Sequence, residues 1–227
     1  MKIVKSLLAA TALVASIGAS ASAQVIGATL GAPAFPFINL TGSGACGACA
    51  LTGVATISGG SVLSADQMTA DANGFSFVPG GLQGGGRFLA AGQGAVGQPS
   101  TLSFTIGIDY VSFLWGSPDL YNRLTVNTNT GGPQTFVAGP VVAPAGTTSL
   151  NLGNQSGSQG FAQYVSFTAI NPGTIITSLV FSNSPLDNNS FEAANFSVRQ
   201  VPEPSNVALM AAGLAALGLI SRRRKLS

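Results

Sequence analysis

Histidine is absent from the 227-residue sequence, and charged residues make up only 7 % of it. Without histidine the chain has no Ser-His-Asp or Cys-His catalytic centre and no histidine-ligated metal site. An ordinary soluble domain is about 25 % charged, and the scarcity of lysine and glutamate excludes a coiled coil. The composition also excludes a nucleic-acid-binding protein, because such a protein needs a stripe of basic residues.

The few charges are unevenly placed along the chain. Between residues 24 and 200 there are three arginines and six acidic residues, a net charge of −3. The other basic residues lie near the two ends of the sequence, where they flank apolar segments. The basic charge therefore indicates targeting rather than a functional surface.

Residues 1–23 have the pattern of a secretory signal peptide. Lys2 and Lys5 form a positive start, residues 7–17 form an apolar run, and an A-x-A cleavage site ends at Ala23. This order predicts export through the Sec translocon and removal by signal peptidase, so that the mature chain begins at Gln24.

Residues 201–227 combine three unlike features in a fixed order. The first is the rigid, extended tetrapeptide Val201, Pro202, Glu203 and Pro204, in which each proline restricts the backbone. An apolar run over 207–220 follows and predicts a single short transmembrane helix, about 21 Å long before its flanks are counted. The third feature is the basic cluster Arg222, Arg223, Arg224 and Lys225, which the positive-inside rule keeps in the cytoplasm.

This C-terminal order resembles the PEP-CTERM sorting signal of Gram-negative bacteria. The resemblance implies recognition by an exosortase, a membrane cysteine protease-transpeptidase that cuts near the VPEP motif. It also implies a precursor anchored in the inner membrane and a mature product at the cell surface or outside the cell. The family is associated with bacteria that produce exopolysaccharide and form biofilms.

Residues 24–200 form one domain, for which the sequence predicts an all-β fold. Apolar and polar residues alternate with the period of two that is typical of strands, and glycine, proline and asparagine clusters separate the runs. This pattern favours an antiparallel β-sandwich or jelly roll. The alternating runs lie at 102–108, 111–115, 124–126, 165–169, 179–181 and 196–198.

Cys46 and Cys49 are the two cysteines of the chain and form a C-x-x-C pair. In an exported protein the default is a local disulfide, and zinc is disfavoured because there is no second pair. A redox role would require the pair at a helix N-terminus, whereas the surrounding glycines favour a loop.

Residues 115–122 hold the densest group of side chains that could contact a ligand. Trp115 or Tyr121 could stack on a sugar ring, and Asp119 with Asn122 could bind its hydroxyls. The competing interpretation is structural: Ser-Pro-Asp is a natural turn, and the single tryptophan shares a strand face with Val111 and Phe113 and is expected in the core.

Two stretches, YVSFLWGSPDLYNRLTV at 110–126 and the later FSNS with FEAANFSV between 179 and 198, resemble a group of exosortase-dependent surface proteins first noticed in cyanobacteria and proteobacteria. The resemblance implies a β-sandwich without an established activity, and it carries over no catalytic residue.

Oxygen-bearing side chains also gather late in the domain, with Asp187, Glu192 and Asn195 as candidate ligands of a structural Ca²⁺. No other cofactor is expected. The sequence thus predicts a non-enzymatic, exosortase-sorted protein of the cell surface or extracellular matrix that is associated with exopolysaccharide. A carbohydrate-binding module is the first alternative, and a secreted hydrolase is the second.

Overall fold

The structure is a computed structural model that describes residues 24–31, 33–67, 82–92, 99–139, 145–152, 161–183, 190–201 and 209–217. Up to residue 201 the described chain is built from strands, with one short 3₁₀ helix, η1 (Ala65–Gln67). The strands are β1 (Ile26–Leu30), β2 (Leu40–Thr41), β3 (Gly44–Ala45), β4 (Cys49–Leu51), β5 (Ala55–Ser58), β6 (Ser61–Ser64), β7 (Arg87–Gly92), β8 (Ser100–Gly116), β9 (Asn122–Thr128), β10 (Gln134–Ala138), β11 (Thr147–Leu150), β12 (Ala162–Ala169), β13 (Ile176–Asn183) and β14 (Ser190–Gln200). The all-β prediction is therefore confirmed.

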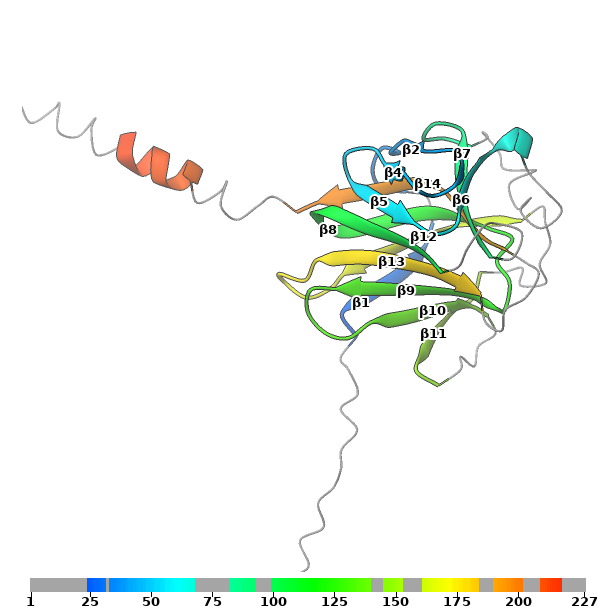
Figure 1. Cartoon of the computed structure of the whole chain (residues 1–227). Coiled ribbons are helices and arrows are strands. Elements are labelled where there is room, and N and C mark those ends of the chain that lie inside the picture. The colour runs from blue at the N-terminus through cyan, green and yellow to red at the C-terminus, as the bar shows by residue number, and fades with distance from the viewer. Residues whose placement is uncertain are drawn as a thin grey trace, which may run out of the picture.

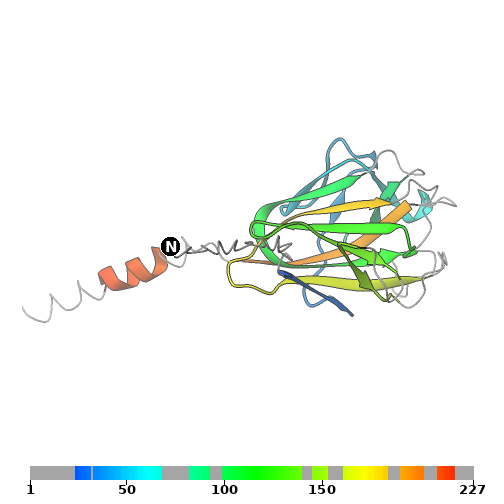
Figure 2. The same cartoon turned by 90° about the horizontal axis from the view of Figure 1, so that it is seen from below.

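Strand β8 divides the hydrogen-bonded network into two layers (Figures 1 and 2). Its residues 100–104 pair with β5 and β13, whereas residues 110–116 pair with β12 and β14. The first sheet has the order β2-β4-β5-β8-β13-β9-β10-β11, and the second has the order β1-β12-β8-β14-β7-β6-β3. The described pairings are antiparallel except that of β10 with β11, which is parallel. The fold is thus the predicted sandwich, in which β8 runs from the interior of one sheet into the interior of the other.

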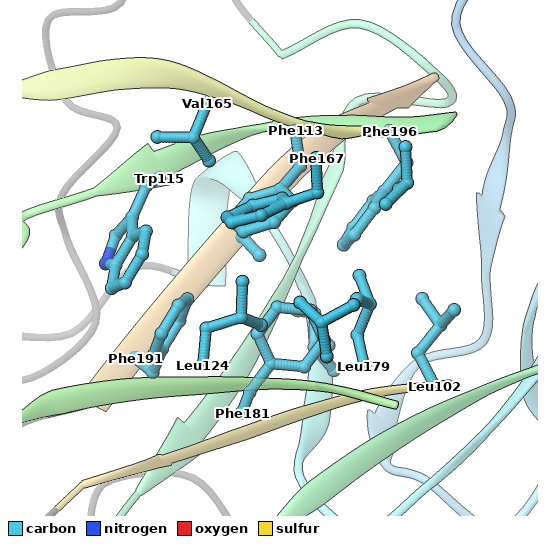
Figure 3. Close-up of a cluster of buried hydrophobic side chains, with 14 of the residues drawn as sticks. Leu102, Phe113, Trp115, Leu124, Val165, Phe167, Leu179, Phe181, Phe191 and Phe196 are labelled. Atoms are coloured by element: carbon cyan, nitrogen blue, oxygen red, sulfur yellow. The ribbon is translucent and has the colours of Figure 1, made fainter. Parts of the chain in front are cut away.

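An aromatic cluster fills the space between the sheets (Figure 3). The ring of Phe113 in β8 lies with its centroid 5.6–6.4 Å from those of five other aromatic residues. These are Trp115, Phe167, Phe181, Phe191 and Phe196, and all are completely or almost completely buried. Each such ring removes about 150–250 Å² from water, so the cluster supplies a large share of the hydrophobic stabilisation.

A β-bulge in β14 allows Phe191 and Phe196 to point into this core. The two residues are an odd number of positions apart, so regular alternation would place them on opposite faces of the strand. The register with β8 shifts between Ala194 and Ser197, and Asn195 adopts a left-handed conformation with φ of 53°. The extra residue of the bulge restores the inward direction of Phe196.

The chain enters and leaves the sandwich at the same end. The amide of Ile170 donates to the carbonyl of Val25, and the amide of Val201 donates to the carbonyl of Gly107. Ile170 and Val201 both line a hollow of 410 Å³ at this end. Gly116 and Asn122 lie at the opposite end, where β14 begins. If the protein is attached through the chain that follows residue 201, the 115–122 turn lies at the end of the domain farthest from the attachment.

Candidate functional site

The C-terminal segment is described only in part. Residues 209–217 form a helix whose nine side chains are all exposed, including Leu209 at 70 %. This helix lies inside the apolar run that predicts one. Among the residues that the structure describes, no helix is both long enough and apolar enough to cross a membrane. Pro202, Glu203 and Pro204 and the basic residues Arg222, Arg223, Arg224 and Lys225 fall outside the described residues.

The predicted signal cleavage site is likewise described on one side only. Ala23 lies outside the described residues, while Gln24 is exposed immediately before β1. The side-chain amide of Gln24 donates to the carbonyl of Ile26 at 2.8 Å, and the amides of Val25 and Ile26 both donate to Oε1 of Gln134. The first residues after the predicted cleavage point are therefore already hydrogen-bonded within the domain.

Cys46 and Cys49 form a disulfide, as the sequence predicts for an exported chain. The bridge joins the residue after β3 to the first residue of β4. Gly42 packs against it, and a Cβ at that position would come within 2.6 Å of Cys49 Sγ. The pair therefore pins a tight turn in a loop, and no helix begins there.

Trp115 has no exposed surface and belongs to the aromatic core. Its indole stacks on Phe191, with ring centroids 4.2 Å apart and planes inclined by 25°. The indole Nε1 donates a hydrogen bond to Oδ1 of Asn122 at 3.2 Å. The structural interpretation of Trp115 is therefore the correct one, and its ring face is not available to a sugar.

Asn122 is completely buried and joins three parts of the chain through its side-chain amide. Its Oδ1 accepts from Trp115 Nε1 and from the backbone amide of Asp119 at 2.9 Å. Its Nδ2 donates to Oδ1 of Asn183 at 2.8 Å and, more weakly, to the carbonyl of Ser190 at 3.5 Å. Both donors and the acceptor are used, so Asn122 closes the turn after β8 and ties it to β13 and β14.

The four residues of the predicted sugar site differ in how far they are exposed. Trp115 and Asn122 are completely buried, Asp119 is nearly so, and Tyr121 alone of the four is partly exposed. The sequence places these residues close together correctly, but burial keeps the Trp115 ring from contact with a sugar, and the turn already uses the side-chain amide of Asn122.

Glu192 lies almost completely buried on β14, opposite Gly116 of β8 and Ala90 of β7. Burial raises the pKa of its carboxyl group well above the ordinary value, and the nearby negative charge of Asp119 raises this pKa further. Its Oε2 has no hydrogen-bond partner. An isolated buried carboxylate is costly, so this group needs either a proton or a cation.

Of the predicted Ca²⁺ ligands, the structure describes Glu192 and Asn195, and their side chains have different partners. The amide of Asn195 is already used, because Oδ1 accepts from the backbone of Gln83 at 2.6 Å and Nδ2 donates to the Tyr164 hydroxyl at 2.9 Å. Asp187 lies outside the described residues. Within the described ranges, no group of three or more acidic, cysteine or histidine side chains could hold a metal. Sequence reasoning missed Asp119 as the neighbour of Glu192, a pairing that depends on the register of β8 with β14.

Uncharged polar residues make up most of the outer side of the first sheet, which also includes the outward residues Val180 and Val137. Because Ile57, Leu102, Leu124 and Leu179 point into the core, their neighbours along each strand point outward. We call this surface the hydroxyl face; its residues are Thr56, Ser58, Thr101, Ser103, Thr125, Asn127, Thr135, Thr147, Ser149, Ser178 and Ser182.

The hydroxyl face is ordered in rows that run across the strands. Thr56, Ser103, Ser178 and Asn127 are neighbours in register, and Asn127 Nδ2 donates to Ser178 Oγ at 2.9 Å. In the next row the hydroxyls of Thr125 and Thr135 lie 2.9 Å apart. Arg123 is the only charged residue among the outward positions of these strands.

Comparison with known proteins identifies a sorting motif in the C-terminal segment. Residues 200–225 match the model of the PEP-CTERM protein-sorting motif. No match to the chain was found among curated proteins or among solved structures. The chain thus carries the sorting motif that its VPEP, helix and basic cluster resemble, and this motif marks an exported surface protein that is sorted by an exosortase.

Proposed function

We propose that the protein is a non-enzymatic component of the cell surface or extracellular matrix that contacts exopolysaccharide. The observation that carries the proposal is the match of residues 200–225 to the PEP-CTERM sorting motif. Signal peptidase removes residues 1–23, and an exosortase then cuts near Pro202–Pro204 in a precursor that the apolar segment over 207–220 holds in the inner membrane.

The position of residue 201 supports an outward presentation of the domain. Because Val25 and Val201 lie at one end, a tether at the sorting motif leaves the outer side of the first sheet facing away from the attachment point. A rigid two-sheet module on such a tether suits a structural role. A hydrolase that cleaves glycosidic bonds would need two carboxyl groups in an open cleft, about 5–10 Å apart. Asp119 and Glu192 are both buried instead.

The hydroxyl face is the surface that we assign to the polysaccharide. Its hydroxyl and amide groups both donate and accept, as sugar hydroxyls do, and it presents almost no charge. A single hydrogen bond contributes only about 1 kcal/mol net, so binding would come from many contacts along a polymer. An uncharged contact surface also predicts retention that depends little on salt.

A binding experiment with matched variants tests this assignment. The protein is passed over immobilised exopolysaccharide of a producing strain at low and high salt, and we expect retention at both. Ser103→Glu places a charge in the middle of the hydroxyl face, whereas Thr29→Glu places one on an exposed residue of β1 in the other sheet. We expect only Ser103→Glu to lose retention. Equal retention of both variants would refute the assignment to this face.

A second experiment tests the sorting itself. In a strain without its exosortase we expect the full-length protein to stay in the inner-membrane fraction. Glu203→Ala should have the same effect in a strain with the enzyme. Normal surface delivery in both strains would overturn the exosortase proposal.

A further inference from the structure

Four residues with oxygen-bearing side chains, Ser117, Asp119, Ser190 and Glu192, lie at the end of the sandwich where β8 ends and β14 begins. Ser190 and Glu192 lie two positions apart on β14, and their side chains point to the face opposite Phe191, which is in the core. Gly116 of β8 is the register partner of Glu192, and Ser117 follows it directly. The Asn122 amide links the backbone of Asp119 to that of Ser190.

These oxygens are buried, and several of them have no partner. The exposed fractions are 1 % for Ser190, 2 % for Glu192, 5 % for Asp119 and 6 % for Ser117. The Oγ atoms of Ser117 and Ser190 and the Oε2 atom of Glu192 make no hydrogen bond. Native proteins leave few buried polar atoms unsatisfied, and three at one corner indicate a missing partner.

The residues beside Glu192 on the neighbouring strands are small. Its neighbours in register are Ala90 on β7 and Gly116 on β8, and the neighbour of Ser190 on β7 is Gly92. None of the three has a side chain larger than a methyl group, so none of them covers the Glu192 carboxyl group with a bulky side chain.

The local charge favours a cation. In the part of the chain that the structure describes, no basic side chain pairs with Glu192, and the ion pair between Arg199 and Asp109 lies at the other end of the sandwich. Two buried carboxyl groups close together are mutually destabilising when both are ionised. A divalent cation between them would remove this repulsion. It would also be coordinated by the buried oxygens of Ser117, Ser190 and Glu192 that make no hydrogen bond.

We infer that Glu192 and Asp119, with the hydroxyls of Ser190 and Ser117, form a Ca²⁺ site. The ligands are all oxygens, since the sequence has no histidine and both cysteines are in the disulfide. Ca²⁺ accepts six to eight oxygen ligands in a flexible arrangement, whereas Mg²⁺ requires a near-ideal octahedron and Zn²⁺ prefers nitrogen and sulfur. The bound ion would link the 115–122 turn to the start of β14.

Luminescence of Tb³⁺, an oxygen-preferring substitute for Ca²⁺, provides a direct test. Trp115 is the only tryptophan and directly precedes Gly116, so its excitation should sensitise an ion bound beside Glu192. The full chain, purified in detergent and freed of metal with a chelator, is titrated with Tb³⁺ under excitation of the indole. We expect a saturable signal that Ca²⁺ displaces and Mg²⁺ displaces far less well.

Variants separate this site from any other. Glu192→Gln removes the charge but keeps the shape and should fold, because it no longer buries a carboxylate; we expect it to lose the Tb³⁺ signal. Asp109→Asn, at the opposite end, should keep the signal. With Ca²⁺ at a hundredfold excess over Kd, we expect the Tm of the wild-type chain to rise by about 5–10 °C. The absence of sensitised luminescence and of a Tm shift in the wild type would overturn the inference, as would either effect persisting in Glu192→Gln.

Discussion

The indole Nε1 of Trp115 donates to Oδ1 of Asn122 across the turn that joins β8 to β9. This bond connects the aromatic core to a network that also includes Asn183 and Ser190. The two residues that most resemble a ligand site in the sequence are therefore the ones that hold the end of the sandwich together.

Replacement of Asn122 by alanine should destabilise the protein strongly. It leaves the Trp115 Nε1 and the Asp119 amide buried without an acceptor, at about 1–3 kcal/mol each, and we expect a total loss of about 2–4 kcal/mol. The measurement is denaturant unfolding. Asn127→Ala is the matched control, since Asn127 lies on the same strand at the partly exposed hydroxyl face and should cost less than about 1 kcal/mol. Equal effects of the two changes would contradict the role given to Asn122.

Trp115→Ala should cost about 3–5 kcal/mol, because it empties a fully buried site that is stacked on Phe191. In the wild type the single tryptophan should emit at short wavelength and resist quenching by acrylamide. Emission typical of indole in water, together with an unchanged unfolding midpoint for Trp115→Ala, would show that the ring is not in the core.

The bulge at Asn195 can be tested with two substitutions that both delete the side-chain amide. Asn195→Gly accepts a positive φ without strain, whereas Asn195→Val does not, because a branched side chain is disfavoured there. We expect Asn195→Val to be less stable than Asn195→Gly by about 1–3 kcal/mol in denaturant unfolding. No difference between the two would mean that residue 195 is not held in the left-handed region.

The raised pKa of Glu192 predicts a pH dependence of stability in metal-free protein. The folded state keeps this proton at pH values where the unfolded chain has lost it, so the folded state binds more protons. The free energy of unfolding should therefore fall as pH rises above the unfolded-state pKa, and should keep falling until pH passes the folded-state pKa. With a chelator present, unfolding by urea at a series of pH values should show this decline in the wild type and a flatter profile in Glu192→Gln. A wild-type profile as flat as that of the variant would contradict the pKa shift.

The strand pattern and the core were predictable from the sequence because they depend on local alternation. Leu102, Leu124 and Leu179 were placed in strands on this ground, and the face shared by Val111, Phe113 and Trp115 is the buried one. The passage of β8 between two sheets was not predictable, since it depends on which strands pair with its two parts.

The errors at the candidate site have a similar origin. The partners of Asn122 and Asn195 include Asn183, Ser190, Gln83 and Tyr164, which are distant in sequence, so burial and hydrogen bonding could not be read from the local motif. One signal was present but was not used. Phe191 and Phe196 are five residues apart, and two core aromatics at an odd spacing on one strand indicate a bulge.

The intact mass of the mature protein from the surface of a producing strain tests the sorting proposal most directly. We expect a chain that begins at Gln24, contains one disulfide and ends near Pro202–Pro204, so that the helix over 209–217 and Arg222–Lys225 are absent. Any additional mass would report a group that is covalently attached to the mature chain. A surface protein whose mass still includes Arg222, Arg223, Arg224 and Lys225 would contradict removal of the sorting segment by an exosortase.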